Sequence, residues 1–528
     1  MTRRKTLTGV LAAAALAVIV AGAFVAVWHV ALPNPGQCPV IDRPANLSPD
    51  FSGATVPPNI APLNFTVREP GTAYYARLSD REGRTVETAG RSPGLSFPLR
   101  KWRALLAASR GRTLALDVCA RDDSGRWKRF RPAEVKVSDD PIDPWLVYRE
   151  MPVYNLAWTD MGCFQRDLES FETEPILRNK SYGFGCMNCH TFPANGAGRL
   201  AMNVRSPSGG GGPAGGMLIA ERGKVTRVVD TRSALGGIPA TYLAWHPSGR
   251  AIAFSVNRIL QCFHTVGNPR DTFDSSSDLG VYRLDTNTVT TSPAVSRPDR
   301  AETYPAWSPD GKYLYFTSAP VLPIQRYSDV RYDLMRVRYD LDNNSWGEPE
   351  TVLAADRQGE RGFSISLPRI SPDGRFVLMC MTAFGNFPAF SPSSDLWMLD
   401  LSTRECHKLD ISSSKSDAWH SWSSNSRWIV FSSKRRDGVF AMPWISHVDT
   451  QGHADKPFLL PQEDPGFYES NVRMYNLPEL VRERVPLTAR EMTAALYDPS
   501  LAVRAVLDPR VKFSSGGAAA GQSDSYVE

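Results

Sequence analysis

A sequence unit repeats four times between residues 241 and 433, and this repeat restricts the possible folds more than any other feature of the chain. Aligned on Trp245, Trp307, Ile370 and Trp422, the copies are spaced by 62, 63 and 52 residues. They are "TYLAWHPSGRAIAFSV" (241–256), "TYPAWSPDGKYLYFTS" (303–318), "SLPRISPDGRFVLMCM" (366–381) and "AWHSWSSNSRWIVFSS" (418–433). Each copy has a short strand pattern, a polar turn and a second apolar strand pattern, so each predicts a β-hairpin.

The turns of two copies contain Asp310-Gly311 and Asp373-Gly374. These residues tolerate a positive φ, which predicts a two-residue hairpin turn. A second repeated piece follows the first three copies, at 277–285, 332–340 and 394–401, and supplies the outer strands of each unit. Asp278, Asp333 and Asp395 recur within this piece, so we interpret them as strand-start or turn residues and not as catalytic carboxylates.

Four-stranded units of this kind cannot bury both faces of their sheets alone, and stacking them around an axis solves the problem. The chain is therefore predicted to be mainly β, with a β-propeller over residues 213–478. Four blades are explicit in the repeat. The stretch 215–230 resembles the outer half of another blade, so we expect five or six.

Other parts of the chain flank this repeat. Residues 38–140 alternate short apolar runs with proline- and glycine-rich turns, which predicts a β-sandwich of the immunoglobulin or fibronectin type III kind. Prolines in "SDDPIDPW" mark its end, and 141–212 form a separate segment before the propeller. Residues 479–528 are expected to form a helix capped by Thr488, with Glu491 three positions later, and a disordered tail.

The first 37 residues determine the expected compartment. Arg3, Arg4 and Lys5 precede an uncharged apolar run from Leu7 to Leu32. As a helix this run is roughly 39 Å long, more than the bilayer core of about 30 Å. We expect an N-terminal anchor in the inner membrane with the rest of the chain in the periplasm; a cleaved signal and secretion are the alternative.

The formal charge of +5 is small for 528 residues, and basic residues cluster only at the extreme N-terminus. This distribution gives no basis for nucleic-acid binding. We expect a periplasmic or membrane protein as the partner.

The stretch "GCMNCHTF" (185–192) contains a CxxCH motif. Two cysteines at this spacing attach the vinyl groups of one haem, and the following histidine binds its iron. The motif predicts one covalent haem c, with Cys186 and Cys189 as thioether anchors and His190 as the proximal ligand. A redox dithiol or half of a zinc site are the alternatives, but the sequence shows neither a thioredoxin-like context nor a second ligand pair.

The distal iron ligand is open at this stage. Met202 lies 12 residues after His190, while His264 and His420 lie near the ends of predicted propeller hairpins. His264 or Met202 is the tentative choice. An iron with no distal protein ligand is a further possibility, and it would permit gas sensing or peroxide chemistry instead of electron transfer alone.

Several stretches of the sequence also resemble a known protein family. "AWSPDGKYLYFTS" and "RISPDGRFVLM" resemble the PD40 or WD40-like repeats of the periplasmic TolB propeller. "VPPNIAPLNF", "FQRDLESF", "CMNCHTF", "WHSWSSNSRWIVFSSKRRDG" and "PFLLPQEDPGFY" resemble exported TolB-like propellers with a single c-type haem motif, a group often labelled cytochrome c biosynthesis or TolB-like translocation proteins. The resemblance implies a periplasmic sandwich, haem segment and propeller. Where relatives tend to have a histidine, this chain has Asn203.

Three functions are consistent with these observations. The first is a membrane-anchored monohaem c-type protein that exchanges single electrons with a periplasmic partner. The second is a TolB-like scaffold for envelope assembly or transport, with a structural or sensory haem. The third is a haem enzyme with an open iron site, although no arrangement of catalytic side chains supports it and we assign no catalytic residue.

Overall fold

The computed structural model describes residues 32–152, 160–206, 215–262, 271–355 and 362–511, and the side chains of residues 261, 262 and 271 are left undescribed. The predicted membrane anchor and His264 therefore lie outside the described residues. No helix within the described ranges is long and apolar enough to span a membrane. The chain divides into two compact units, each of which is described by itself.

The first unit comprises Met1–Ala54, Pro62–Val137 and Pro461–Ser470. Its larger sheet has β8 at its centre, with β9, β10 and β5 as neighbours. The strands of that sheet that belong to this unit are β1 (Val40–Ile41), β5 (Ala73–Ser79), β6 (Thr85–Gly90), β8 (Thr113–Arg121), β9 (Trp127–Phe130) and β10 (Ala133–Val137). A second sheet contains β2 (Leu47–Ser48), β4 (Phe65–Val67) and β7 (Gly94–Leu95).

Two helices accompany these sheets, α2 (Leu99–Ala108) and α3 (Phe467–Ser470). Neither helix was predicted from the sequence. Trp102 of α2 is fully buried and packs against Phe97, so the helix contributes to the core of this unit.

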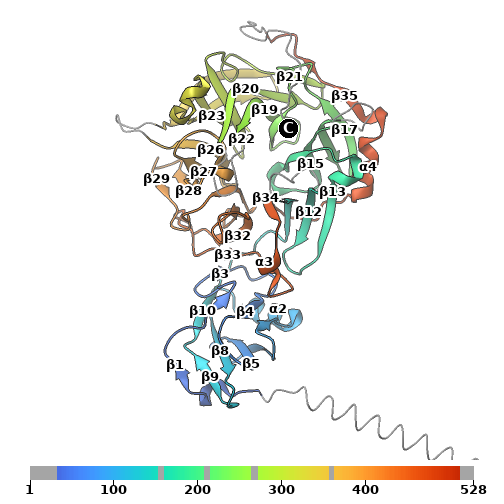
Figure 1. The fold of residues 1–528 in the computed structure, drawn as a ribbon. Helices are drawn as coiled ribbons and strands as arrows, with labels where there is room; N and C mark the ends of the chain where they lie inside the picture. The colour runs from blue at the N-terminus through green and yellow to red at the C-terminus, as the bar shows by residue number, and fades with distance from the viewer. Residues whose placement is uncertain (1–31, 153–159, 207–214, 263–270, 356–361, 512–528) are drawn as a thin grey trace, which may run out of the picture. The chain divides into compact units, whose positions relative to one another are not determined.

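The second unit is a β-propeller, and six of its sheets are arranged around a common centre (Figure 1). We call them blades 1 to 6. Blade 1 contains β11 (Trp145–Met151), β12 (Gly162–Asp167), β13 (Thr173–Arg178) and β34 (Met474–Val481). Blade 2 contains β14 (Met187–Thr191), β15 (Arg199–Val204), β16 (Gly216–Glu221), β17 (Lys224–Asp230) and β35 (Ala502–Arg504). Blade 3 contains β18 (Thr241–Trp245), β19 (Ala251–Cys262), β20 (Asp271–Arg283), β21 (Thr288–Thr290) and β36 (Val506–Leu507).

The other three blades have four strands each. Blade 4 contains β22 (Arg300–Trp307), β23 (Tyr313–Pro320), β24 (Asp333–Asp340) and β25 (Ser345–Leu353). Blade 5 contains β26 (Ser364–Ile370), β27 (Phe376–Thr382), β28 (Asp395–Asp400) and β29 (Cys406–Lys408). Blade 6 contains β30 (Asp417–Trp422), β31 (Trp428–Ser433), β32 (Met442–His447) and β33 (Phe458–Leu459).

The inner strands close the ring. β34 packs against β14, and contacts then continue from β14 to β18, β22, β26 and β30, which in turn packs against β34. The four predicted hairpins are the β18–β19, β22–β23, β26–β27 and β30–β31 pairs, and 215–230 forms the outer strands β16 and β17. The propeller prediction is confirmed.

Two expectations need correction. The segment 141–212 was expected to stand apart from the propeller, but its strands β11 to β15 belong to blades 1 and 2. Their inner strands lack the "SPDG" turn that marks the repeat, and β34 comes from a remote part of the sequence. The hairpin turns are also longer than two residues. In the β22–β23 hairpin, for example, the strand pair nearest the turn joins Trp307 to Leu314. Gly311 does have the expected positive φ of 72°.

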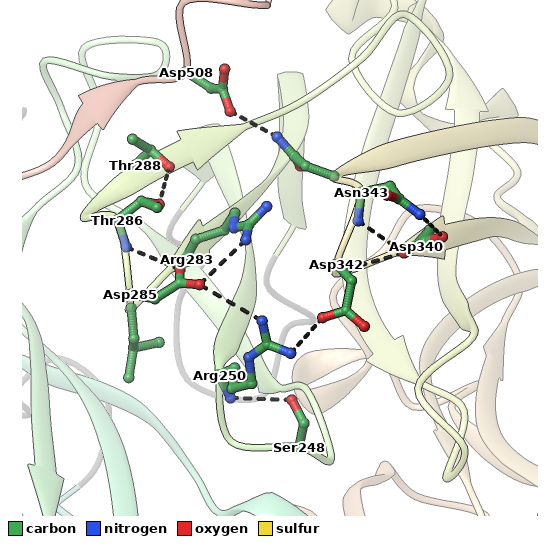
Figure 2. Close-up of polar contacts among 12 residues, drawn as sticks. Ser248, Arg250, Arg283, Asp285, Thr286, Thr288, Asp340, Asp342, Asn343 and Asp508 are labelled. Carbon is green, nitrogen blue, oxygen red and sulfur yellow. Dashed lines mark hydrogen bonds and ion pairs between the residues drawn. The ribbon is translucent and has the colours of Figure 1, made fainter.

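Polar contacts on the loops join blades 3 and 4. Arg250 donates to Asp342 over 2.6 Å and lies 3.8 Å from Asp285, as Figure 2 shows. Beyond the blades, helix α4 (Ala489–Leu496) begins with the predicted capping box between Thr488 and Glu491. The parallel edge strands β35 and β36, which follow α4, were not predicted.

Candidate functional site

The CxxCH motif lies on β14, the innermost strand of blade 2. Cys186 directly precedes the strand, while Cys189 and His190 are within it. The three residues are 6%, 7% and 2% exposed, respectively. The motif is therefore part of the propeller core.

The inner strands share one backbone irregularity, and the motif occupies the corresponding place. Register shifts occur after equivalent residues in the six inner strands. Each shift encloses two residues, and the first of them is Asn188, Tyr242, Tyr304, Leu367, Trp419 or Leu477. All except Asn188 have φ between 44° and 53°, which bulky residues rarely adopt. Recurrence at five equivalent positions identifies this bulge as a regular feature of the ring. In β14, Cys189 lies inside the shift and His190 directly follows it.

His190 has an unusual environment. Its Nδ1 lies 3.8 Å from Sγ of Cys163, whereas its buried Nε2 has no hydrogen-bond partner among the described residues. Burial, with a smaller contribution from the positive charge of Arg149, lowers the pKa of His190 to about 3. The imidazole is therefore neutral at physiological pH, as a metal ligand must be.

The two motif thiols are free and differ in their surroundings. Cys186 belongs to an apolar cluster with Tyr182 and Cys163, and its Sγ lies 3.5 Å from Oδ1 of Asn188. Cys189 lies near the backbone of Tyr242 in the next inner strand. Burial raises the pKa of both thiols.

Three arginines add positive charge to this region. Nη1 of Arg149 donates to the carbonyl oxygen of Met187 over 3.2 Å and to Oδ1 of Asn188 over 3.0 Å. The backbone nitrogen of Arg205 donates to the carbonyl of Cys186 over 2.7 Å. Arg369 forms an ion pair with Glu479. Arg149 and Arg205 have no carboxylate partner within the described part of the chain.

The residues considered as distal ligands have different surroundings in the structure. Met202 pairs directly with His190 across β14 and β15, so the two side chains project from the same face of the sheet. His420 uses Nε2 toward the carbonyl of Leu378 at 3.0 Å and Nδ1 toward Cys380 at 3.6 Å. Asn203 is fully buried and donates through Nδ2 to the carbonyl of Ala240.

Unsatisfied polar atoms gather around the motif. Apart from Nε2 of His190, four other buried side-chain atoms in this region lack a hydrogen-bond partner among the described residues. They are Nε of Arg149, the hydroxyl of Tyr182, Oδ1 of Asn203 and Nε of Arg205. Buried polar atoms are normally paired with protein groups or water, so these atoms are available to a further polar group. Sequence reasoning missed Arg149, Cys163, Tyr182 and Arg205, because no local motif connects them with residues 186–190.

These residues fit a covalently attached haem in their chemistry. Two free thiols, an imidazole nitrogen with no other partner and unpaired guanidinium groups for the propionates are all present. Their packing, however, is not that of a haem-bound motif. Cys189 and His190 are consecutive strand residues that contact different neighbours, so attachment of a haem to both cysteines requires another local conformation of this strand. No cluster of three or more His, Cys, Asp or Glu side chains in the described ranges could hold a metal ion on its own.

No protein-family model matches this chain, and no match was found among the curated proteins compared with it. Solved structures resemble it at low identity. Prolyl oligopeptidase B from Galerina marginata is 12% identical, with a TM-score of 0.34 over 66% of this chain and 42% of that one. The β-propeller domain of the trilobed protease from Pyrococcus furiosus is 10% identical, with a TM-score of 0.31 over 64% of this chain and 79% of that one.

The chain thus spans about two fifths of the length of the first oligopeptidases that it matches. A chain in a nidogen–laminin complex is 7% identical, with a TM-score of 0.36 over 64% of this chain and 99% of that one. These likenesses concern the β-propeller fold and give no information about activity.

Proposed function

We propose that this chain is an exported, membrane-anchored TolB-like propeller protein that carries one haem c and exchanges single electrons with a periplasmic or membrane partner. Cys186 and Cys189 would hold the haem covalently, and His190 would bind the iron. The observation that carries the proposal is the buried, neutral His190, whose Nε2 has no partner in the described structure, beside two free thiols. The charged and then apolar N-terminus supports the periplasmic location.

The chain's own residues would set the conditions for this chemistry. The bound haem would supply one-electron chemistry at its iron. Burial keeps the His190 ring neutral and excludes water from it. Cys163, at 3.8 Å, is positioned to fix the ring orientation through Nδ1.

Mass spectrometry of the purified exported protein, together with a reduced-minus-oxidised spectrum, tests the proposal. We expect the added mass of one haem and c-type bands, both lost in the double variant Cys186→Ala, Cys189→Ala. A Cys380→Ala variant is the matched control, since Cys380 is a buried free thiol of blade 5 outside the motif. A wild-type protein of unmodified mass, produced in cells that mature other c-type cytochromes, would contradict the haem assignment.

A structural haem on a TolB-like scaffold is the second candidate, and the burial of the motif favours it. Residues less than a tenth exposed keep the attached group away from a docking partner. If the haem is structural, the double cysteine variant lowers the thermal midpoint while partner capture from solubilised membranes persists. If the haem transfers electrons, the oxidation rate by that partner depends on the haem and is lost with it.

A further inference from the structure

The two unpaired arginines beside the motif suggest what else the site binds. We propose that Arg149 and Arg205 form an anion-binding pair that holds the carboxylates of the group attached at Cys186 and Cys189. This inference rests on the proposed function and assigns a role to residues that lie outside the motif.

Both arginines lie close to the first cysteine of the motif. The Arg149 guanidinium contacts the backbone and side chain of the two residues that follow Cys186, and the Arg205 backbone binds the Cys186 carbonyl. The positive charges of Arg205 and Arg149 both act to lower the pKa of the Cys186 thiol, although burial has the larger, opposite effect. The Arg149 guanidinium and the Arg205 backbone are therefore both held beside the first cysteine of the motif.

Neither guanidinium has its charge balanced. Among the described residues no carboxylate forms an ion pair with either one, and Nε of each is buried without a hydrogen-bond partner. By contrast, Arg369 in the same region pairs with Glu479. Leaving a partly buried guanidinium without a counter-charge is unfavourable, so an anion is expected here.

The adjoining sequence cannot supply that anion. Residues 153–159, "VYNLAWT", follow the strand that carries Arg149, and residues 207–214, "PSGGGGPA", lie shortly after Arg205; neither segment contains an acidic residue. These two segments therefore do not supply the counter-charge. A haem carries two propionate carboxylates, and guanidinium groups bind carboxylates with paired hydrogen bonds.

The hydroxyl of Tyr182 is a third polar group in this region that lacks a partner among the described residues. It is buried, lacks a partner in the described structure and belongs to the same apolar cluster as Cys186. Burial raises its pKa, so the hydroxyl remains a hydrogen-bond donor at all physiological pH values. It would add a neutral donor to the two cationic ones.

The reduction potential of the loaded protein tests this pair. In Arg149→Gln and Arg205→Gln, the carboxylates would lose a compensating charge, which favours the more positive oxidised iron. We expect a shift of about tenfold in the ratio of oxidised to reduced protein, equivalent to about 59 mV for one electron. The potential should also become more pH-dependent, since the carboxylate pKa rises when its cation is removed.

Two variants complete the design. Arg149→Lys keeps the charge and should recover most of the potential. Arg338→Gln removes one exposed charge from β24 of the same propeller and should leave the potential unchanged.

The outcomes separate the two proposals. A loaded wild type whose potential and pH dependence are unaltered in both glutamine variants overturns the arginine assignment alone. A wild type that never acquires haem overturns the proposed function and this inference together. A variant that fails to fold is identified by its circular dichroism, in which case Arg149→Lys measured against wild type at several salt concentrations decides the matter.

Discussion

His190 and Met202 are direct cross-strand neighbours, paired across β14 and β15 within blade 2. Since both side chains leave the sheet on one face, we expect that Met202 is not the distal ligand. Met202 is fully buried and His190 is 2% exposed, so the pair lies within the propeller core.

The first prediction follows from this pairing. Met202→Leu should leave the iron spectrum of the loaded protein unchanged and cost less than about 1.5 kcal/mol of stability, because the change nearly conserves volume. His190→Ala should remove the proximal ligand and alter the spectrum. A loss of the methionine–iron charge-transfer band in Met202→Leu alone would show that the strands rearrange on loading.

An ion pair of the central ring gives the second prediction. Glu479 is 8% exposed and pairs with Arg369, whose side chain is 33% exposed. Glu479→Gln leaves a partly solvated guanidinium without its carboxylate and should cost about 1–2 kcal/mol of unfolding free energy. The double variant Arg369→Met, Glu479→Leu should be closer to wild type, and a double-mutant cycle by urea unfolding measures the coupling. Strict additivity of the single changes would show that the pair is not coupled.

The third prediction concerns pH. His447 lies 3.0 Å from Asp140 and 3.3 Å from Asp455. Burial lowers the pKa of its ring, but the hydrogen bonds with Asp455 and Asp140 more than offset this, so the net shift is upward. The stabilisation is complete below the unfolded pKa of about 6.5 and is lost as the pH rises through the folded value.

The temperature of the thermal midpoint should therefore decrease as the pH is raised from about 5.5 to about 8.5. Burial raises the pKa of Asp274 to about 7 and of Glu302 to about 8, which acts in the same direction, so the informative quantity is the difference between wild type and His447→Gln. An identical pH profile in the variant would refute the role of His447.

The closing strand supplies the fourth prediction. Leu480 of β34 is fully buried, whereas Val472, shortly before the strand, is 64% exposed. Leu480→Ala should cost about 2–5 kcal/mol through lost burial and a cavity, while Val472→Ala should stay within about 0.5 kcal/mol of wild type. Urea unfolding followed by tryptophan fluorescence measures both. Equal midpoints would mean that β34 contributes little to closing the ring.

The repeat predicted four blades because each hairpin signal is local: an apolar run, a polar turn with Gly311 or Gly374, and a second apolar run. In blade 2 the sequence indicated only the outer strands within 215–230, because β14 and β15 lack the "SPDG" turn of the repeat. Blade 1 was not predicted, because its inner strand pairs residues that are distant in the sequence, as in Trp145 with Val481, and no periodicity encodes such a partner. The same holds for the site, where the motif identified Cys186, Cys189 and His190 but spatial packing alone brought Arg149 and Cys163 beside them.

The chain is synthesised from its N-terminus, so the motif strand β14 is made long before β34. The motif strand ends at Thr191, whereas the strand that packs against it begins at Met474. If the chain is exported as proposed, the thiols of Cys186 and Cys189 would leave the membrane before the last inner strand is delivered. An enzyme that attaches the proposed haem would then have access to both thiols during this interval, before β34 closes the ring beside the motif.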